Sequence, residues 1–371
     1  MNTTFWLFFS YLGFILLIFS ALFIYSVYRR YEWWYFPAIV IALVGAFIID
    51  FYIVIFSPRG LHPNSGSTYE IIIPRGANLS SIGSLLKANQ IIKSTGQFLW
   101  IARLLGYETV LKAGKFQFTD PYSYYQLLKN LSTISNVQVR VTIPEGLHTA
   151  QIASILMRAV GIDSTRFYAL VQDSGFCSSL DIPVPNLNGF LLPETYYFYW
   201  GMDESEIIAK MVHQFKAIIT DSIKIKMNES AMNLLAYVTL ASIIEGEAVH
   251  DDERKTISAV FHNRLKKHIK LDADPTLQFI IPDRPRRLYN SDKLIDSPYN
   301  TYLYRGLPPG PINNPGKQSI MAAFFPDDVD YLYFVAQGNG SHIFSDRYEQ
   351  HLIAKKKLDK LRKKLQEEQE N

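Results

Sequence analysis

The sequence predicts a membrane-anchored protein of the mixed α+β class, and three features of the chain predict it. Two long apolar stretches, Phe5–Val27 and Pro37–Phe56, occupy the first sixty residues. A strand, turn and helix pattern then occurs twice, and a later apolar run, Leu234–Ile244, has the length of a buried helix. We therefore expect an N-terminal transmembrane helix hairpin, small α+β modules and a larger mixed α/β domain.

Each N-terminal stretch reaches the ~20 residues that a bilayer-spanning helix requires. The loop between them, residues 28–35, contains Arg29 and Arg30 among aromatic side chains. Basic loops stay in the cytoplasm, so the chain after Ser57 is expected on the outer side. The first residues carry no basic group, which argues against a cleaved signal peptide. Asp50, inside the second stretch, can either reach the interface or have a functional role.

Composition limits the classes of partner and cofactor. About 310 of the 371 residues lie outside the two stretches, enough for two or three domains. The net charge of +3 is too small to indicate a nucleic-acid partner. Cys177 is the single cysteine and the eight His residues show no HExxH spacing, so we expect no disulfide, metal or cofactor. An outward-facing chain without disulfides favours a bacterial envelope.

A repeat follows the membrane segment. Ile71–Gly76 and Val141–Gly146 lie 70 residues apart, and each reads as a strand and a Pro-x-Gly turn before an amphipathic helix. The first copy continues with a helical segment, residues 97–105, and a strand-like run, Lys112–Phe118. This order of strand, helix, helix and strand resembles the LysM module, a small fold that binds N-acetylated sugars. A spacer that holds the next domain off the membrane is the alternative, and both remain open.

These patterns divide the chain into five segments. The last segment is rich in basic and acidic residues, which predicts an exposed helix. The expected segments are residues 1–60 for the two transmembrane helices, 61–136 for the LysM-like module, 137–187 for the second strand-turn-helix module, 188–350 for the largest domain and 351–371 for the charged C-terminal helix.

Two carboxylates lie at the end of the buried helix that begins at Leu234. Glu245 and Glu247 flank Gly246, directly after the apolar run. Burial raises the pKa of a carboxyl toward the range that a general acid needs, whereas a solvated or capping Glu is the ordinary alternative. Residues two apart on a helix point about 200° apart, so the two acids can share a role only if the helix ends between them, and Gly246 is a plausible break.

Several motifs accompany this helix, and each is ordinary by itself. They are the Pro-x-Gly repeat with its Pro-Glu-Gly copy at Pro144–Gly146, Leu192–Tyr196, Ala241–Ala248, Phe261–Leu265, Asp274–Thr276, Tyr299–Tyr302, Gly306–Ile312 and Tyr331–Ala336 followed by Gly340–Phe344. Together and in this order they closely resemble the MltG (YceG-like) family of bacterial endolytic murein transglycosylases. The resemblance covers about residues 69–355. It implies that residues 188–350 form the catalytic domain, with a lysozyme-like catalytic helix end.

The resemblance also implies a reaction. One Glu would protonate the glycosidic oxygen between N-acetylmuramic acid and N-acetylglucosamine, then accept the proton of the muramic C6 hydroxyl as a 1,6-anhydro ring closes. The family analogy favours Glu247 as this acid, with Glu245 as the alternative or a supporting acid. The expected substrate-binding residues are Tyr299, Asn300, Gln278, Asp274, Glu194 and His342.

Peptidoglycan glycan strands and the membrane are the partners that the resemblance implies, with cell-wall synthases as further partners. The expected location is the bacterial cytoplasmic membrane, with the catalytic domain on its outer side, where the enzyme would terminate growing strands. Family members generally have one span, so the hairpin is a departure. Two other functions stay open: a muramidase that uses water, and a peptidoglycan-binding scaffold without turnover.

Overall fold

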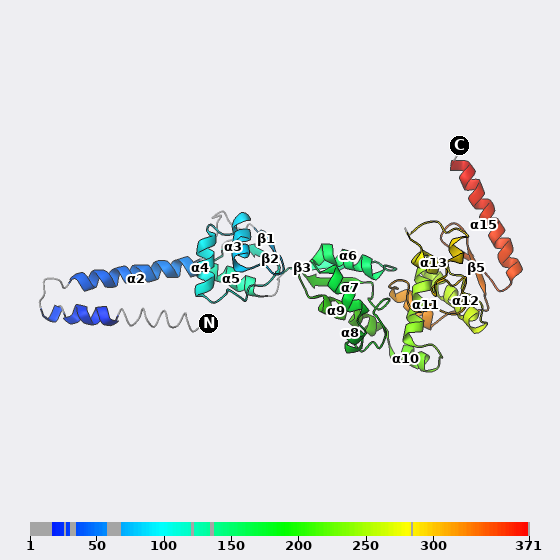
Figure 1. Cartoon of the computed structure of the whole chain (residues 1–371), viewed down its shortest axis with the longest axis horizontal. Coiled ribbons are helices and arrows are strands. Elements are labelled where there is room, and N and C mark those ends of the chain that lie inside the picture. Colours follow the sequence, from blue (N-terminus) through cyan, green and yellow to red (C-terminus); the bar gives the residue numbers. More distant parts are fainter. Residues whose placement is uncertain are drawn as a thin grey trace. The chain divides into compact units, whose positions relative to one another are not determined.

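The computed structural model of this chain describes residues 17–25, 27–29, 35–57, 68–119, 122–133, 137–282 and 285–369. The described residues form two compact units (Figure 1). The first contains the residues up to Val139 together with Phe198–Met202, and the second contains Arg140–Tyr197 and the chain from Asp203 onward. Helices and short antiparallel strands build both units, which confirms the mixed α+β class.

Helix α2 (Tyr35–Phe56) is the described helix that is long and apolar enough to cross a membrane. Its segment Ala38–Phe56 has a mean hydropathy of 2.8, and Asp50 is its single residue of the Asp, Glu, Lys and Arg types. Residues 17–25 are also helical, but residues 1–16 and 30–34 lie outside the described residues. The hairpin therefore remains a prediction, whereas the second span is present as a helix.

After α2 comes the first module, residues 68–133. Its elements are β1 (Thr68–Ile73), α3 (Leu79–Ala88), α4 (Thr95–Leu104), β2 (Gly114–Thr119) and α5 (Tyr124–Ser132). The expected order of strand, helix, helix and strand is present, and β1 pairs antiparallel with β2 from Thr68↔Thr119 to Ile73↔Gly114. Helix α5 was not predicted, although its N-terminus carries a capping box between Ser123 and Gln126.

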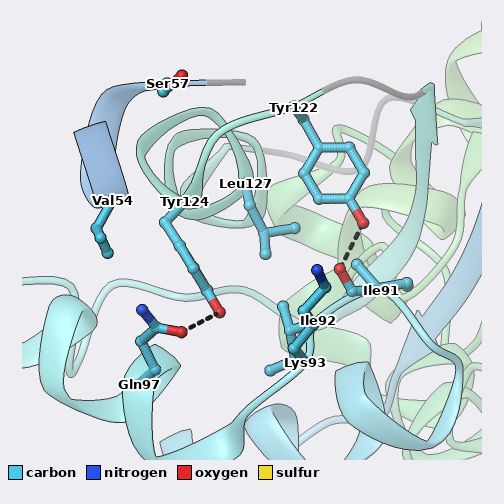
Figure 2. Close-up of a pocket in the computed structure, with 9 residues that line it drawn as sticks. All are labelled: Val54, Ser57, Ile91, Ile92, Lys93, Gln97, Tyr122, Tyr124 and Leu127. Atoms are coloured by element: carbon cyan, nitrogen blue, oxygen red, sulfur yellow. Dashed lines mark hydrogen bonds between the residues drawn. The ribbon is translucent and has the colours of Figure 1, made fainter. Parts of the chain in front are cut away.

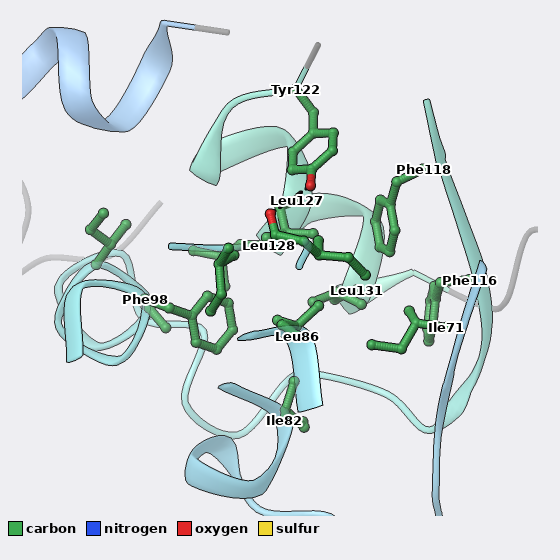
Figure 3. Close-up of a cluster of buried hydrophobic side chains, with 14 of the residues drawn as sticks. Ile71, Ile82, Leu86, Phe98, Phe116, Phe118, Tyr122, Leu127, Leu128 and Leu131 are labelled. Carbon is green, nitrogen blue, oxygen red and sulfur yellow. Dashed lines mark hydrogen bonds between the residues drawn. The ribbon is translucent and has the colours of Figure 1, made fainter. Parts of the chain in front are cut away.

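The core of the first module follows from strand alternation. Ile71 and Ile73 of β1 point inward, as do Phe116 and Phe118 of β2, because alternate side chains of a strand face opposite sides (Figure 3). These side chains pack on the apolar faces of α3, α4 and α5. The Tyr122 hydroxyl donates a hydrogen bond of 2.6 Å to the carbonyl of Ile91, which ties α5 to the α3–α4 linker (Figure 2).

The second copy of the repeat opens the second unit. It consists of β3 (Gln138–Thr142), α6 (Thr149–Val160), α7 (Ser164–Gln172), α8 (Ser174–Ser179) and β4 (Thr195–Tyr199). Both copies make their turn with a glycine at positive φ, Gly76 at 76° and Gly146 at 74°, which other residues rarely adopt. Strand β3 pairs with β4, so the strand that completes this copy comes after residue 187.

The rest of the second unit is mainly helical. Its elements are α9 (Glu204–Ile218), α10 (Asp221–Asn228), α11 (Leu234–Glu247), η1 (Asp251–Glu253), α12 (Arg254–Lys266), α13 (Asp274–Ile280), η2 (Asp292–Leu294), α14 (Lys317–Phe324), β5 (Tyr333–Ala336), β6 (His342–Ser345) and α15 (Tyr348–Gln369). Helix α11 is in contact with α12, α13 and α14. Every residue of α11 from Tyr237 to Ile244 is buried, so the apolar run is a core helix, as predicted.

Candidate active site

Helix α11 carries both predicted acids and remains helical between them. It starts after Asn233, whose side chain accepts the N–H of Ala236, and it ends at Glu247. The expectation that Gly246 breaks the helix is therefore wrong. A side chain at Gly246 would meet Pro275, since a Cβ built there lies 2.5 Å from the Pro275 Cβ. This glycine allows α13 to approach α11, and the two acids point to different neighbours.

Glu245 is a buried, paired acid. Its side chain is 6% exposed, and its Oε2 lies 3.2 Å from Nη1 of Arg254. The same oxygen accepts the backbone N–H of Gly316 at 3.0 Å, at the start of α14. Arg254 also bonds Asp251 at 2.8 Å and the hydroxyl of Ser319. These bonds connect the ends of three helices.

The Pro-Glu-Gly turn of the second copy joins this network. The Glu145 Oε2 lies 3.9 Å from Nη2 of Arg254, and the Glu145 carboxyl packs so closely on Gly316 that no Cβ fits there. Burial raises the pKa of Glu145, and the nearby charge of Glu245 raises it further. This turn is therefore part of the same acidic cluster as the end of α11.

Asn314 fixes the loops around that cluster. Its carbonyl accepts the N–H of Gly146, and its backbone N–H donates to the carbonyl of Leu147, both at 2.9 Å. Its side-chain oxygen accepts the N–H groups of Gly189 and Leu191 at 3.0 and 3.2 Å. One residue thus connects the Gly306–Gly316 loop to the Pro-Glu-Gly turn and to the loop before β4.

Glu247 has different surroundings from Glu245. Within the described part of the chain, no Lys or Arg forms an ion pair with it. Burial raises the pKa of Glu247 to about 8, and the negative charge of Asp274 contributes to this shift. A hydrogen bond from the Asp274 backbone and the more distant charge of Arg264 offset part of it. The carboxyl is therefore mostly protonated at neutral pH, which is the state that a general acid needs.

Asp274 and Tyr302 form a second polar pair beside Glu247. Asp274 is the first residue of α13, and its Oδ1 accepts a hydrogen bond of 2.5 Å from the Tyr302 hydroxyl. Burial, the bond to Asp274 and the charge of Glu247 all raise the pKa of Tyr302. The ammonium of Lys293 lies 4.6 Å from the centre of the Tyr302 ring. Of the predicted substrate-binding residues, Asp274 is thus the one that acts on Glu247 electrostatically.

Tyr299 and Asn300 were predicted to orient the substrate. The structure gives these two neighbouring residues different surroundings. Tyr299 is half-buried, its ring lies 4.8 Å from that of Phe279, and burial raises the pKa of its hydroxyl. Asn300 is completely buried. Its amide donates to the carbonyls of Lys293 and Ile295 and accepts the N–H of Tyr302. Asn300 therefore shapes its own loop, because all of its polar atoms have protein partners.

The other predicted binding residues have protein partners as well. Gln278 donates to the carbonyl of Arg286 at 2.5 Å. His342 is 8% exposed and its Nδ1 lies 2.7 Å from Oε2 of Glu253, so it belongs to the packing of β6 on η1. Glu194 is exposed, and its charge raises the pKa of Glu145, which places it near the Pro-Glu-Gly turn.

Residues that sequence reasoning did not assign complete the site. Glu145 and Tyr302 lie within sequence motifs but were given no role, and Arg254 and Asn314 lie outside the motifs. Their roles depend on contacts between distant segments, which no local pattern contains. Among the described residues, no group of three or more His, Cys, Asp or Glu has the arrangement of a metal site.

Comparisons with known proteins identify relatives of this chain. The sequence model of the YceG-like family matches residues 71–357. An endolytic murein transglycosylase of Bacillus subtilis (strain 168) is 33% identical over 311 residues, which cover 79% of this chain and 86% of that protein. An endolytic murein transglycosylase of Streptococcus pneumoniae is 29% identical over 325 residues, which cover 78% of this chain and 58% of the relative. The crystal structure of a YceG-like protein from Listeria monocytogenes matches with a TM-score of 0.54 and 29% identity, over 76% of this chain and 97% of that one.

Proposed function

Since the chain belongs to the YceG-like family, we propose that it is a membrane-anchored endolytic murein lytic transglycosylase whose general acid is Glu247. The observation that carries the assignment is the contrast between the two acids of α11. Burial keeps Glu247 protonated, with a pKa of about 8, whereas Glu245 is paired with the guanidinium of Arg254. Only a protonated carboxyl can donate to a glycosidic oxygen.

The reaction follows from this single acid. The Glu247 proton passes to the glycosidic oxygen, so that the C1–O bond of N-acetylmuramic acid breaks and N-acetylglucosamine leaves with a free hydroxyl. The Glu247 carboxylate then accepts the proton of the C6 hydroxyl as O6 bonds to C1, which closes the 1,6-anhydro ring and restores the acid. No water is consumed, and the attacking oxygen belongs to the substrate, so the step is intramolecular.

Glu245 acts in this proposal as a positioning residue. Its bonds to Arg254 and to Gly316 hold the end of α11 against α12 and α14. The rigid Gly306–Gly316 loop is fixed to the same helix, because the N–H of Ile312 donates to the Ser242 hydroxyl at 3.0 Å. The acid is thus held on a buried helix end with connected loops, as a preorganised site requires.

Asn313 is a further candidate for substrate contact. It is 9% exposed and donates to the carbonyl of Ser242, whereas its side-chain oxygen has no donor among the described residues. A buried acceptor beside Gly246 can accept the N–H of an N-acetyl group. Asn313→Leu should then raise KM more than it lowers kcat, and an unchanged KM would exclude this contact.

One observation favours a second candidate, the water-using muramidase. Asp274 places a second carboxyl next to Glu247, and hydrolytic glycosidases use two carboxyls. Mass spectrometry of murein incubated with the full-length chain separates these functions. The transglycosylase leaves 1,6-anhydro ends, whereas the muramidase leaves reducing ends heavier by one water. If neither product forms, the chain is a binding scaffold.

The membrane anchoring and the topology of the N-terminal segment are also proposals. Helix α2 supports anchoring by its length and composition, and the basic loop around Arg29 supports the hairpin. A reporter enzyme that is active only outside the cytoplasm should work when fused after Gly60 and stay silent when fused at Tyr31. The reverse pattern would exclude the hairpin. The sugar-binding role of the first module stays a prediction.

A further inference from the structure

We propose that the first module binds the phosphate group of an anionic glycerophospholipid in the cavity between the end of α2 and helices α4 and α5. This inference rests on the membrane anchoring in the proposed function and does not depend on its chemistry. The cavity has a volume of about 130 Å³. Four observations support a lipid as the ligand. They are the position of α2 in the bilayer, the aromatic residues around its end, the residues that line the cavity and the net charge of the module.

The packing of α2 places the first module at the membrane boundary. The apolar segment Ala38–Phe56 has 19 residues and is about 28 Å long at 1.5 Å per residue, close to the ~30 Å of the hydrocarbon core. The bilayer therefore needs nearly all of this segment. Phe51 and Ile55, near its end, are nevertheless buried in the core of the first module, at 8% and 0% exposed. The module must meet the membrane where the headgroups begin.

Aromatic side chains of the module lie at that level. The Trp100 ring of α4 packs edge-on against Phe51 at 5.6 Å and is 51% exposed. The Tyr125 ring of α5 packs against Phe56 at 5.3 Å and is 36% exposed. Trp and Tyr are favoured at membrane–water interfaces, where an apolar ring and a polar atom are both satisfied. These exposed rings indicate that α4 and α5 face the lipid headgroups.

The lining of the cavity suits a lipid headgroup (Figure 2). Val54, Ile92 and Leu127 supply aliphatic walls beside the membrane helix. Lys93 supplies an exposed ammonium, and no carboxylate forms an ion pair with it within the described part of the chain. The Tyr124 hydroxyl donates to the side-chain oxygen of Gln97 at 3.3 Å, so the Gln97 amide nitrogen remains as a donor.

A cation and an amide donor over an aliphatic wall match a phosphate diester that carries acyl chains. A sugar site would instead offer an exposed aromatic face, whereas Tyr122 is buried and Tyr124 is the other aromatic residue of the lining. The net charge of the module also favours an anionic lipid. Residues 68–133 contain seven Lys or Arg and three Asp or Glu, a net charge of +4, whereas the whole chain has +3. Positive charge near a membrane end attracts anionic lipids.

Native mass spectrometry of the delipidated full-length chain in neutral detergent tests the proposal. Dihexanoyl phosphatidylglycerol is the probe, with dihexanoyl phosphatidylcholine, geranylgeranyl phosphate and an N-acetylglucosamine oligomer as the competing occupants. Lys93→Glu removes the cation, and Gln97→Trp fills the cavity from an exposed position. Lys87→Glu makes the same charge change on α3 outside the cavity.

We expect phosphatidylglycerol to bind the unaltered chain, and Lys93→Glu and Gln97→Trp each to weaken it about tenfold or more, the scale of a lost charge-assisted hydrogen bond. Lys87→Glu should change binding less than about twofold. Equal binding of phosphatidylcholine, preference for the isoprenoid phosphate or the sugar oligomer, or equal loss in Lys87→Glu would overturn the proposal. Murein turnover by the unaltered chain in the same preparation shows separately whether the proposed function fails.

Discussion

At the residue scale, Glu245 and Glu247 differ in their neighbours rather than in their chemistry. Both lie partly exposed at the same helix end, but Glu245 pairs with Arg254, whereas no Lys or Arg of the described residues forms an ion pair with Glu247. A buried carboxyl without a cationic partner gains a proton, which makes Glu247 an acid. Glu245, two positions earlier, is held by its bonds to Arg254 and Gly316.

Glu247→Gln should stabilise the protein in a pH-dependent way. The folded pKa of Glu247 is about 8 and its ordinary value is 4.5, so the folded chain keeps a proton that the unfolded chain releases between these values. Wild-type stability therefore falls as pH rises from 4.5 to 8, whereas Gln does not titrate. Thermal unfolding should show little difference near pH 4 and a gain on the order of a few kcal/mol near pH 9.

Glu245→Gln is the matched comparison for that experiment. It removes the buried carboxylate that pairs with Arg254 at 3.2 Å, while Asp251 stays bonded to the guanidinium at 2.8 Å, so the cost should be smaller than the about 3–5 kcal/mol of a completely broken buried pair. We therefore expect a loss of stability in this variant. A gain in Glu247→Gln that is the same at all pH values would contradict the raised pKa of Glu247.

Asp274→Asn should shift the pH dependence of turnover. The Asp274 charge raises the pKa of Glu247, so its removal lowers that pKa, and the protonated acid is lost at a lower pH. The pH at which kcat/KM declines on the alkaline side should therefore be lower by about one pH unit. Asp296→Asn is the control, because Asp296 accepts a bond of 2.5 Å from Tyr304 just as Asp274 does from Tyr302. Abolished activity without this shift would favour the muramidase, in which Asp274 takes part in the chemistry.

At the element scale, the close approach of α11 and α13 decides where Asp274 lies. Gly246→Ala would ordinarily stabilise a helix by about 1 kcal/mol. Here the new Cβ would lie 2.5 Å from Pro275, so overpacking should instead cost about 1–3 kcal/mol and displace the start of α13. We expect lower thermal stability and lower turnover. Gly96→Ala in α4 is the control, since its nearest neighbour lies 3.9 Å away and it should be neutral or stabilising. Equal effects of both changes would show that the α11–α13 contact is unimportant.

The elements differ in how far the sequence predicts them. Helix α11 and its terminal acid are predicted, because a continuous apolar run and a carboxylate at its end are local features. The suggested helix break at Gly246 is absent. This glycine instead allows the close approach of Pro275, a contact with a distant segment that no local pattern reveals. Asn300 and His342 were expected to face a substrate, but the Asn300 amide is bonded within its own loop and His342 Nδ1 is bonded to Glu253. Side-chain partners of this kind depend on tertiary packing, which the sequence pattern does not contain.

At the scale of the whole molecule, the chain divides two physical tasks between its units. The first unit holds the membrane helix, the exposed aromatic residues at its end and an excess of positive charge. The second holds the buried helix with Glu247 at its end and the loops that Asn314 connects. The proposed membrane attachment and the proposed acid catalysis therefore depend on different residues, so each can be tested separately in the intact chain.

The product spectrum of three forms of the full-length chain tests the central assignment most directly. Wild type, Glu247→Gln and Glu245→Gln are incubated with purified murein, and 1,6-anhydro ends are counted by mass spectrometry over time. Wild type should release them, and Glu247→Gln should be slower by ~10²–10⁴, the scale of a lost general acid. Glu245→Gln should keep more activity than Glu247→Gln at temperatures where it is folded. Near-normal release by Glu247→Gln, with loss in Glu245→Gln, would place the acid two positions earlier, and activity in both would contradict catalysis from the end of α11.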